Sequence, residues 1–453
     1  MRIHLIAIGG AVMHNLAIAL KLKGYEVSGS DDEIFEPSRS RLASYKLLPM
    51  KEGWDPDLIT PGIDVIILGM HAAKDNPELV KAGKLGLKIM SFPEYIYEQT
   101  KNKKRIVVAG SHGKTTTTAI IMHVFKSLGI NFDYMVGSNI DNYESMVGLS
   151  DKSEIAVLEG DEYLTSALDR RPKFHLYKPD IAILNGIAWD HINVFPTFEN
   201  YVEQFRIFID CIEEGGTLIY YEGDDEVKKL ALGSHKKIKK IPYKIHGFFQ
   251  NKTGFYATTL KHVIPLKIFG EHNMQNFSAA KEACLEAGIN EDDFYKAVQS
   301  FEGTAKRLQK LIENQNGVAY LDFAHSPSKV KATVEAVSAR YPGKPIISCL
   351  ELHTYSSLNI NFLPHYSGTL DKTTYPYVYF NPHVLKVKNM PSVTANEVKA
   401  AFGNKKLSVF DNSLEMFSFI QKQNYRDPVF LFMSSGNFDG FNLRKLAEKL
   451  INT

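Results

Sequence analysis

The chain of 453 residues is poor in features that mark several classes of protein. Its three cysteines, Cys211, Cys284 and Cys349, lie far apart in apolar surroundings and show no metal-binding or disulfide spacing. We therefore expect buried thiols in a reducing cytoplasm. No apolar run reaches about 18 residues, so no membrane insertion is predicted. The apolar N-terminal stretch lacks a small-residue cleavage site, and we interpret it as a strand and a helix.

The sequence also lacks a marked excess of charge of either sign. Its 53 basic and 51 acidic residues give a net charge of +2, and the basic residues form no local patch, so no nucleic-acid partner is predicted. Hydrophobic residues make up 44% and charged residues 23%, which is the balance of a globular protein. At about 100–200 residues per domain, the length predicts two to four domains.

Strand and helix patterns alternate along the chain, which predicts an α/β fold with parallel sheets covered on both faces. Strands are predicted at 3–8, 26–30, 64–69, 88–91, 106–109, 154–158, 180–184, 317–322, 345–350, 377–380, 407–410 and 429–433, with helical segments at 11–23, 198–212, 273–298 and 327–340. The pattern restarts twice. We therefore expect three domains, at 1–101, 102–302 and 303–453, with the polar run 101–105 as a solvated linker.

A glycine-rich turn, Gly110 to Thr115, follows the apolar strand 106–109 and opens a helical stretch from Thr116. Free N–H groups at a helix start bind phosphate oxygens, a lysine reaches the terminal phosphates, and a hydroxyl after it can bind magnesium. The spacing between the two glycines is shorter than in the common Walker motif. The candidate phosphate-binding residues are Gly110, His112, Gly113, Lys114, Thr115 and Thr116.

Acidic and amide side chains follow the next two predicted strands of this segment. Glu159, Asp161 and Glu162 come directly after the strand 154–158, where open α/β sheets bind their ligands. Carboxylates there suit Mg²⁺, although a helix N-cap cluster has the same composition. Asn185 and the Asp190-His191 pair follow the strand 180–184, and we interpret His191 as a ligand, against the alternative of a satisfied histidine.

Three further motifs carry polar groups in the C-terminal half. Asn273 and Asn276 are three residues apart, so their amides share one helix face and could bind a purine edge, or could cap the helix. Arg307 could close over a γ-phosphate, or could be a surface cation. Asp322 and His325 end a predicted strand just before a helix that begins near a proline.

Six motifs in order resemble the Mur ligase family, whose members join amino acids or peptides to UDP-N-acetylmuramate with ATP. They are VAGSHGKTTTT at 108–118, LEGDEY at 158–163, Asp190-His191, GEHNMQN at 270–276, KRL at 306–308 and DFAHSP at 322–327. The resemblance covers essentially the whole chain. It implies an N-terminal Rossmann-like UDP-binding domain, a central P-loop ATPase-type parallel sheet and a C-terminal Rossmann-like domain.

The resemblance also implies roles for residues, with ATP and Mg²⁺ as cofactors. The muramoyl carboxylate would attack the γ-phosphate, and the amine would then displace phosphate from the acyl phosphate. We expect a monomer or a homodimer. The implied residues are Lys114, Glu159, His191 and Arg307 for catalysis; Asn273, Asn276, Arg307 and Asp322 for ATP; Thr115, Glu159 and His191 for metal; Gly9, Gly10, Met13, Ser30 and Asp31 for UDP-sugar; and His325 and His353 for the acceptor.

Within the family the chain resembles two muramate-recognising types. Residues 168–174 and the ending 433–440 resemble the recycling ligase, which attaches L-Ala-γ-D-Glu-meso-diaminopimelate, whereas His353 with Tyr355 and Ser356 resembles the L-alanine-adding ligase. We predict the tripeptide as acceptor and keep L-alanine as the alternative. The chain departs from the usual family pattern at Ala7, His14, Asn15, Ser326, Thr354 and Ser357.

Two other classes of function are kept as alternatives. A non-catalytic binding protein on a ligase scaffold fits the altered loop and acceptor motifs, but Lys114, Thr115, Glu159 and His191 argue against it. A dinucleotide oxidoreductase is suggested by Gly9, Gly10 and Asp31, but the fingerprint is incomplete.

Overall fold

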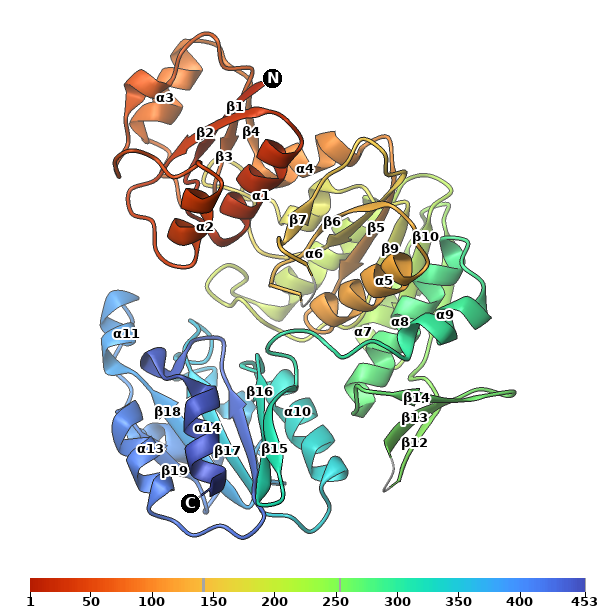
Figure 1. Ribbon diagram of the computed structural model, residues 1–453, viewed down its shortest axis with the longest axis vertical. Helices are drawn as coiled ribbons and strands as arrows, with labels where there is room; N and C mark the ends of the chain where they lie inside the picture. The colour runs from red at the N-terminus through yellow and green to blue at the C-terminus, as the bar shows by residue number, and fades with distance from the viewer. Residues whose placement is uncertain (141–142, 252–253, 453) are drawn as a thin grey trace. The chain divides into compact units, whose positions relative to one another are not determined.

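The computed structural model describes residues 1–140, 143–251 and 254–452. They form an α/β fold with three mostly parallel sheets in succession, one in each of the three segments expected from the sequence (Figure 1). The predicted fold class is confirmed, and the boundaries at 101/102 and 302/303 stay predictions. The chain packs into two compact units, one of Met1–Ile187, Val202–Lys244 and Phe277–Val298, the other of Ala188–Tyr201, Ile245–Asn276 and Gln299–Thr453.

A four-stranded parallel sheet opens the first unit. Its elements are β1 (Arg2–Ile6), α1 (Ala11–Leu22), β2 (Glu26–Ser30), α2 (Ser38–Ser44), the 3-10 helix η1 (Pro56–Leu58), β3 (Val65–Leu68), α3 (Pro77–Lys84), β4 (Ile89–Ser91) and α4 (Phe92–Thr100). The strand order is β2-β1-β3-β4. Helix α4 starts at a capping box between Ser91 and Glu94, which satisfies two N–H groups of its first turn.

A seven-stranded sheet forms the rest of the first unit's framework. Its strands are β5 (Lys104–Ala109), β6 (Phe132–Met135), β7 (Val147–Gly148), β8 (Ile155–Glu159), β9 (Ile181–Leu184), β10 (Thr217–Tyr221) and β11 (Lys239–Tyr243). The helices of this stretch of chain are α5 (Lys114–Ser127), the 3-10 helix η2 (Lys173–Leu176), α6 (Phe198–Asp210), α7 (Asp225–Gly233), α8 (Glu271–Glu286) and α9 (Glu291–Val298). The order is β11-β10-β9-β5-β8-β6-β7, and only β7 runs antiparallel to its neighbour. The carboxyl ends of β5, β8 and β9 therefore meet at one edge.

The polar run 101–105 ends in this sheet: Lys101 and Asn102 form an exposed turn, as a solvated linker predicts, but Lys104 and Arg105 open β5 and Arg105 is buried, so the prediction was wrong for the end of the run. Arg105 lies in β5 with its side chain only 4% exposed. Its guanidinium pairs with Asp180 at 3.1 Å and donates to the Lys101 carbonyl at 2.6 Å. A buried cation is tolerated when carboxylates and carbonyls satisfy its donors. Asp180 lies far along the chain, so the composition of the charged run alone does not reveal this ion pair.

A small antiparallel sheet in the second unit was missed by the sequence analysis. It consists of β12 (Phe248–Asn251), β13 (Gly254–Thr258) and β14 (Val263–Leu266) in that order. Residues 255–258 alternate between buried and half-buried positions, the pattern of a strand with one covered face. The strands are only four or five residues long, so their period-two signal is weak.

A six-stranded sheet organises the rest of the second unit. Its strands are β15 (Gln309–Asn314), β16 (Gly317–Asp322), β17 (Ile346–Leu352), β18 (Tyr375–Phe380), β19 (Ser408–Phe410) and β20 (Val429–Met433). The helices are α10 (Pro327–Arg340), η3 (Leu363–Tyr366), α11 (Pro382–Val387), α12 (Ala395–Phe402), α13 (Ser413–Gln421), η4 (Phe438–Gly440) and α14 (Leu443–Asn452). The order is β15-β16-β20-β17-β18-β19, with β15 antiparallel to β16. The buried core includes Ile347, Cys349, Phe430 and Phe432 from β17 and β20.

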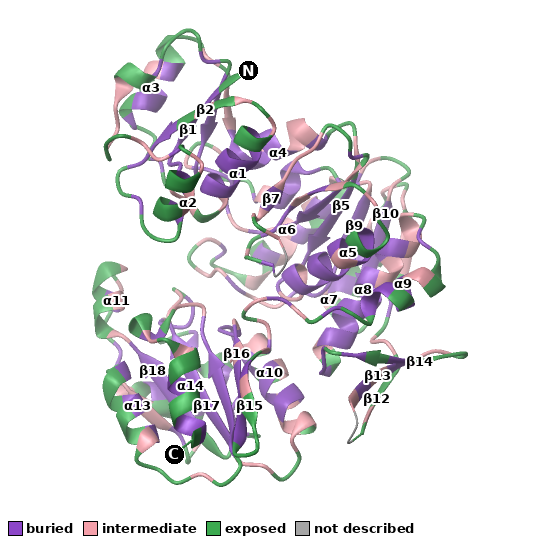
Figure 2. Cartoon of the chain, viewed as in Figure 1, coloured by how far each residue is buried: buried purple, intermediate pink, exposed green. Residues whose placement is uncertain are grey.

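Burial follows the layers that the sequence predicts. Figure 2 shows buried strands in the parallel sheets and helices with exposed outer faces. Cys284 and Cys349 are buried free thiols as expected, whereas Cys211 is only partly buried. Among the described residues, no helix is both long enough and apolar enough to span a bilayer.

Candidate active site

The glycine-rich loop of residues 110–113 joins the end of β5 to the start of α5. Gly113 has φ 76°, a left-handed conformation that glycine adopts without strain. Gly110 has φ 128°, and a Cβ there would come within 3.1 Å of the backbone nitrogens of Asn185 and Gly186. The helix begins at Lys114 rather than at the predicted Thr116. The backbone N–H groups at the start of this helix give the loop the geometry of an anion-binding site.

Lys114 is held by an internal anion. Its ammonium donates to the Glu162 carboxylate at 2.6 Å and to the Gly110 carbonyl at 2.7 Å. Burial acts to lower the pKa of Lys114, but the carboxylates around it, chiefly Glu162 and then Asp161, outweigh that effect and raise the pKa. The lysine is therefore charged, and a phosphate that binds here competes with Glu162 for it.

Thr115 and Glu159 lie together at the carboxyl end of β8. The Thr115 hydroxyl donates to Glu159 Oε1 at 3.1 Å, and the Gly137 N–H donates to Glu159 Oε2 at 3.1 Å. A hydroxyl beside a carboxylate provides the hard oxygen donors that Mg²⁺ takes, with waters completing its octahedron. No group of three or more His, Cys, Asp or Glu side chains suited to a metal occurs in the described part of the chain. His191, the third expected ligand, belongs to the second unit.

Two neighbours of the loop have structural roles. Gly186 leaves room for His112, because a Cβ at residue 186 would come within 2.5 Å of His112 Nε2. Asn185, at the end of β9, donates to the Thr117 hydroxyl at 3.0 Å and accepts from the Tyr243 hydroxyl at 2.8 Å. Asn185 therefore ties the end of β9 to helix α5 beneath the loop.

The expected UDP-sugar residues cluster at the carboxyl ends of β1 and β2. Asp31 accepts from the Gly9 N–H at 2.7 Å, and a Cβ at Gly9 would come within 2.9 Å of the same carboxylate oxygen. Burial raises the pKa of Asp31 to about 7. Ser30 and Met13 are buried, and the Ser30 hydroxyl donates to the buried Glu78 carboxylate. Glycine at position 9 and the Asp31 carboxylate thus define the turn.

The departures at Ala7, His14 and Asn15 have physical explanations. Ala7 has φ 68°, a region that favours the glycine usual at this place in the family. The His14 ring hydrogen-bonds the Gly10 carbonyl at 2.9 Å. Asn15 Oδ1 accepts from the Met146 N–H at 3.0 Å and from the Arg41 guanidinium at 3.0 Å. The amide at position 15 therefore fastens helix α1 to the chain just before β7.

In the second unit, the Asp190 carboxylate lies close to Lys329 and His325. Lys329, in the first turn of α10, pairs with Asp190 at 3.3 Å, and His325 Nε2 lies 4.0 Å from the same oxygen. Burial acts to raise the pKa of Asp190, but Lys329 together with the neighbouring histidines and the His191 N–H outweighs it and holds the pKa below its usual range. Burial lowers the pKa of His325 to about 3, so this ring is neutral at pH 7. His191 follows with φ 54°, its N–H donating to Asp190 Oδ1 at 2.8 Å.

The asparagine pair of the GEHNMQN motif lies at the start of α8. Both Asn273 and Asn276 are buried, and the Asn273 amide donates to the Phe269 carbonyl at 2.8 Å. Gly270 has φ 94°, and a Cβ there would come within 2.6 Å of the Ala336 side chain. The motif therefore packs closely against α10, and the Asn273 amide bonds a carbonyl just before its helix rather than accepting from a helix N–H as a capping side chain does.

Arg307 and Asp322 lie on adjoining turns. The Arg307 guanidinium stacks over the Phe323 ring at 4.8 Å. Asp322 accepts from the Leu308 N–H at 2.6 Å and from the Ala324 N–H at 2.8 Å. Leu308 has φ 45°, so the Asp322 carboxylate stabilises a backbone turn that a leucine rarely adopts.

His353 and the turn after β20, which resembled ligases with different acceptors, lie in one cluster at the carboxyl ends of β17 and β20. Buried Glu351 accepts from the Ser434 hydroxyl and from the Phe438 N–H, the latter at 2.9 Å, so it fixes the turn after β20. His353 Nδ1 lies 3.8 Å from the other Glu351 oxygen. A Cβ at Gly436 would come within 2.8 Å of Glu351 Oε2 and 3.0 Å of the His353 ring.

We expect Gly436→Ala to destabilise this cluster, because the added Cβ must displace a buried carboxylate or the imidazole. The free energy of unfolding should fall by about 1–3 kcal/mol, and the KM for the amine substrate should rise. Gly233→Ala is the matched control, since nothing lies within 4 Å of a Cβ there. Denaturant unfolding of both variants checks the prediction, and equal stability of the two would contradict it.

Three residues contact these sites in ways that the sequence analysis did not predict. Glu162 pairs with Lys114, Lys329 pairs with Asp190, and Glu351 holds the turn beside His353. Glu162 and Glu351 stand at or just after a strand end, which is a usable signal. No signal in the sequence pointed to Lys329, because a lysine in the first turn of a helix is most often a surface residue.

Comparison with known proteins shows the family to which the chain belongs. The family model described as the Mur ligase middle domain matches residues 108–284, and the one described as the Mur ligase family catalytic domain matches residues 2–104. The chain belongs to the Mur ligase family. It is thus an ATP-dependent ligase of peptidoglycan precursor synthesis.

Individual relatives carry two different names. The chain is 31% identical to a UDP-N-acetylmuramate–L-alanine ligase of Caldicellulosiruptor saccharolyticus, over 78% of each chain. It is 29% identical to the UDP-N-acetylmuramate–L-alanyl-γ-D-glutamyl-meso-2,6-diaminoheptandioate ligase of Escherichia coli, over 78% of this chain and 79% of that one. The crystal structure of a murein peptide ligase from Psychrobacter arcticus has the same fold, with a TM-score of 0.68 at 20% identity, over 100% of this chain and 99% of that one.

Proposed function

We propose that this ligase joins the tripeptide L-Ala-γ-D-Glu-meso-diaminopimelate to UDP-N-acetylmuramate in peptidoglycan recycling. The observation that carries the proposal is the segment 161–174, whose residues 168–174 resemble the recycling ligases. It folds as a hairpin, with a bridge between Leu164 and Pro172 and a bond from the Thr165 N–H to the Arg171 carbonyl at 3.0 Å. The hairpin is part of the first unit, so the residues that resemble the recycling ligases lie in a folded element of this chain.

The reaction would pass through an acyl phosphate. The muramoyl carboxylate attacks the γ-phosphorus of ATP and releases ADP, and the amine then attacks the acyl carbon and expels phosphate to leave an amide. We assign Lys114 to the β- and γ-phosphates, with the first-turn N–H groups of α5 around them. Mg²⁺, when bound, would neutralise phosphate charge, and Thr115, Glu159 and His191 are its proposed ligands.

The residues of the second unit would recognise the other parts of the substrates. We assign Asn273 and Asn276 to the adenine side of ATP and Arg307 and Asp322 to its phosphate and ribose side. His325 and His353 would line the acceptor. His325 suits that role because a neutral imidazole does not repel an ammonium, whereas a charged one would.

The uridine diphosphate would bind at the carboxyl edge of the first sheet. Gly9 and Gly10 allow close approach to the backbone of this turn, and Met13, Ser30 and Asp31 adjoin it. The positive φ of Ala7 supports the proposal, because the chain keeps the turn that a glycine would form even though the glycine is absent.

L-Alanine is the second candidate acceptor. His353 favours it, because this histidine, with Tyr355 and Ser356, resembles the L-alanine-adding type. The choice between the two amines is tested by measuring phosphate release with UDP-N-acetylmuramate, ATP and either the tripeptide or L-alanine. Faster release with the tripeptide supports the proposal, and release with L-alanine alone contradicts it.

A further inference from the structure

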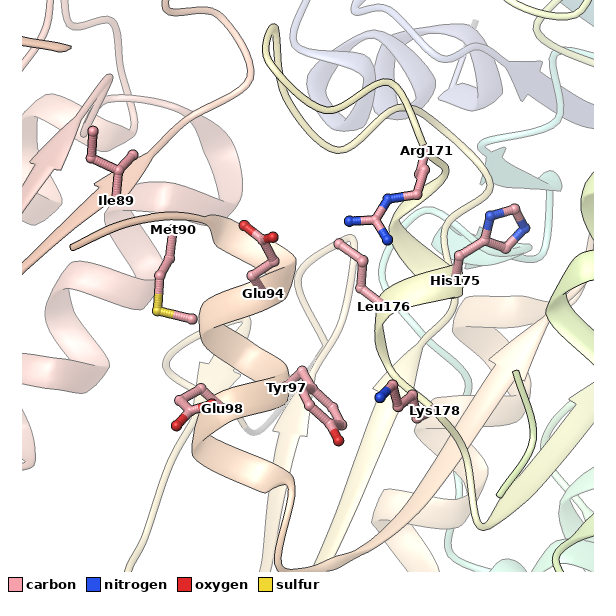
Figure 3. Close-up of a pocket in the computed structure, with 9 residues that line it drawn as sticks. All are labelled: Ile89, Met90, Glu94, Tyr97, Glu98, Arg171, His175, Leu176 and Lys178. Atoms are coloured by element: carbon pink, nitrogen blue, oxygen red, sulfur yellow. The ribbon is translucent and has the colours of Figure 1, made fainter. Parts of the chain in front are cut away.

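A cavity in the first unit lies apart from the residues assigned above. It has a volume of about 240 Å³ and is bounded by β4 and α4 on one side and by the chain around η2 on the other (Figure 3). Arg171 and His175 also line an adjoining, larger hollow of about 650 Å³. At about 30 Å³ per water, the smaller cavity holds roughly eight waters. That volume suits a ligand of amino-acid size, below the 300–1,000 Å³ of sites for larger molecules.

Opposite charges face one another across this cavity. Figure 3 shows the Arg171 guanidinium and the Glu94 carboxylate pointing toward each other from the two walls. The two groups form no ion pair with each other, because each is bonded to a residue on its own side of the cavity. Arg171 uses Nε and Nη2 on Asp169, with its Nη2 at 2.6 Å from the carboxylate, and Glu94 uses Oε2 on Ser91 at 2.7 Å. Arg171 Nη1 and Glu94 Oε1 have no partner among the described residues.

Lys178 and His175 add a second cation and a hydrogen-bond acceptor to the lining of the cavity. The Lys178 ammonium lies 5.3 Å from the centre of the Tyr97 ring, and no carboxylate pairs with it in the described chain. His175 Nε2 lies 2.7 Å from the Gln204 carbonyl, so it carries the proton and leaves Nδ1 as an acceptor. Burial lowers the pKa of His175, which keeps the ring neutral. Glu98, the other acid, is neutralised by Lys101 at 2.6 Å.

The hairpin 161–174 connects this cavity to the phosphate loop. One of its arms begins at Asp161 and Glu162, and Glu162 holds Lys114. The other ends at Lys173, which pairs with Asp161 at 2.5 Å. The same ordered segment thus carries Arg171 at the cavity and the anion partner of the catalytic lysine.

We infer that this cavity binds a small amino-carboxylate, with carboxylate groups on Arg171 and Lys178 and an ammonium on Glu94. The open Nη1 of Arg171 and the Lys178 ammonium, facing the open Oε1 of Glu94, match a ligand with one ammonium and two carboxylates, as in a dicarboxylic amino acid or a peptide that contains one. Charge-assisted hydrogen bonds of this kind are the strong ones. The site goes beyond the proposed ligase reaction, and its occupancy can be measured without ATP or UDP-N-acetylmuramate.

Calorimetric titration of the full-length protein with L-glutamate tests the inference directly. We expect saturable binding to one site, with glutarate, which lacks the ammonium, at least tenfold weaker. Arg171→Gln and Lys178→Gln should each weaken glutamate binding at least fivefold, because both side chains are exposed and their loss leaves the fold intact. Arg426→Gln is the matched control, an exposed arginine far along the chain, and should bind as the parent does.

The same titration with the tripeptide identifies the source of the ligand. If the tripeptide also loses affinity in Arg171→Gln, the site binds the peptide, and if only glutamate does, it binds a free amino acid; either result supports the site. No saturable binding of glutamate overturns the inference. So does equal binding of glutarate, or glutamate binding that is unchanged in both cavity variants. None of these outcomes depends on which amine the ligase uses.

Discussion

Lys114→Ala is expected to lower kcat/KM for ligation by at least about a thousandfold. The lysine supplies a fixed positive charge at the start of α5, where the phosphates of ATP would bind. No water in the loop can replace it, because a water carries no net charge and must be ordered anew in each turnover. Glu162, which Lys114 now neutralises at 2.6 Å, would stay in the site and repel phosphate. Steady-state phosphate release measures the loss.

A matched variant separates the effect of Lys114 from that of removing any lysine. Lys126 lies in the last turn of the same helix, and its side chain is exposed. Lys126→Ala should therefore keep kcat/KM within about twofold of the parent value. Circular dichroism should show both variants folded, since Lys114 stands on a loop-to-helix junction rather than in the apolar core. Turnover of Lys114→Ala near that of the parent would overturn the assignment of the phosphate loop.

Glu159→Gln should lower kcat by about a hundredfold and raise the concentration of Mg²⁺ needed for half-maximal rate. The amide keeps the size of the side chain and can still accept from the Gly137 N–H, but it removes the negative charge beside the Thr115 hydroxyl. A neutral oxygen binds a hard dication more weakly than a carboxylate does. Magnesium titrations of the steady-state rate check this prediction.

Glu154→Gln provides the control for this substitution. Glu154 is exposed and stands immediately before β8, at the opposite end of the strand from Glu159. Its replacement should change neither kcat nor the magnesium requirement. A Glu159→Gln enzyme with the parent's magnesium dependence would exclude Glu159 as a metal ligand.

Much of the fold could be predicted because its signals are local. Strands such as 317–322 and 429–433 and the helix 327–340 have the predicted bounds, since buried apolar runs and a proline near the helix start mark them directly. Arg105 was misinterpreted because its partners, Asp180 and Glu213, are distant in sequence. Whether a charge is solvated depends on the tertiary structure.

The sites show the same division. The phosphate loop and the acidic strand end were found from residue type and spacing, and Thr115 and Glu159 do lie in contact. The ion pair between Lys114 and Glu162 was not predicted, because Lys114 had been assigned to phosphate and Glu162 considered for magnesium. In the sequence, His353 and the turn after β20 resembled ligases with different acceptors. In the structure both contact Glu351, so the two features belong to one cluster.

The amine that this ligase uses is the central claim, and one assay tests it most directly. Purified enzyme is supplied with UDP-N-acetylmuramate, ATP and Mg²⁺, and phosphate release is followed with L-Ala-γ-D-Glu-meso-diaminopimelate or L-alanine as the only amine. We predict that kcat/KM for the tripeptide exceeds that for L-alanine by at least about a hundredfold, as expected where several buried polar contacts distinguish two substrates. Phosphate release with L-alanine and none with the tripeptide would contradict the proposal.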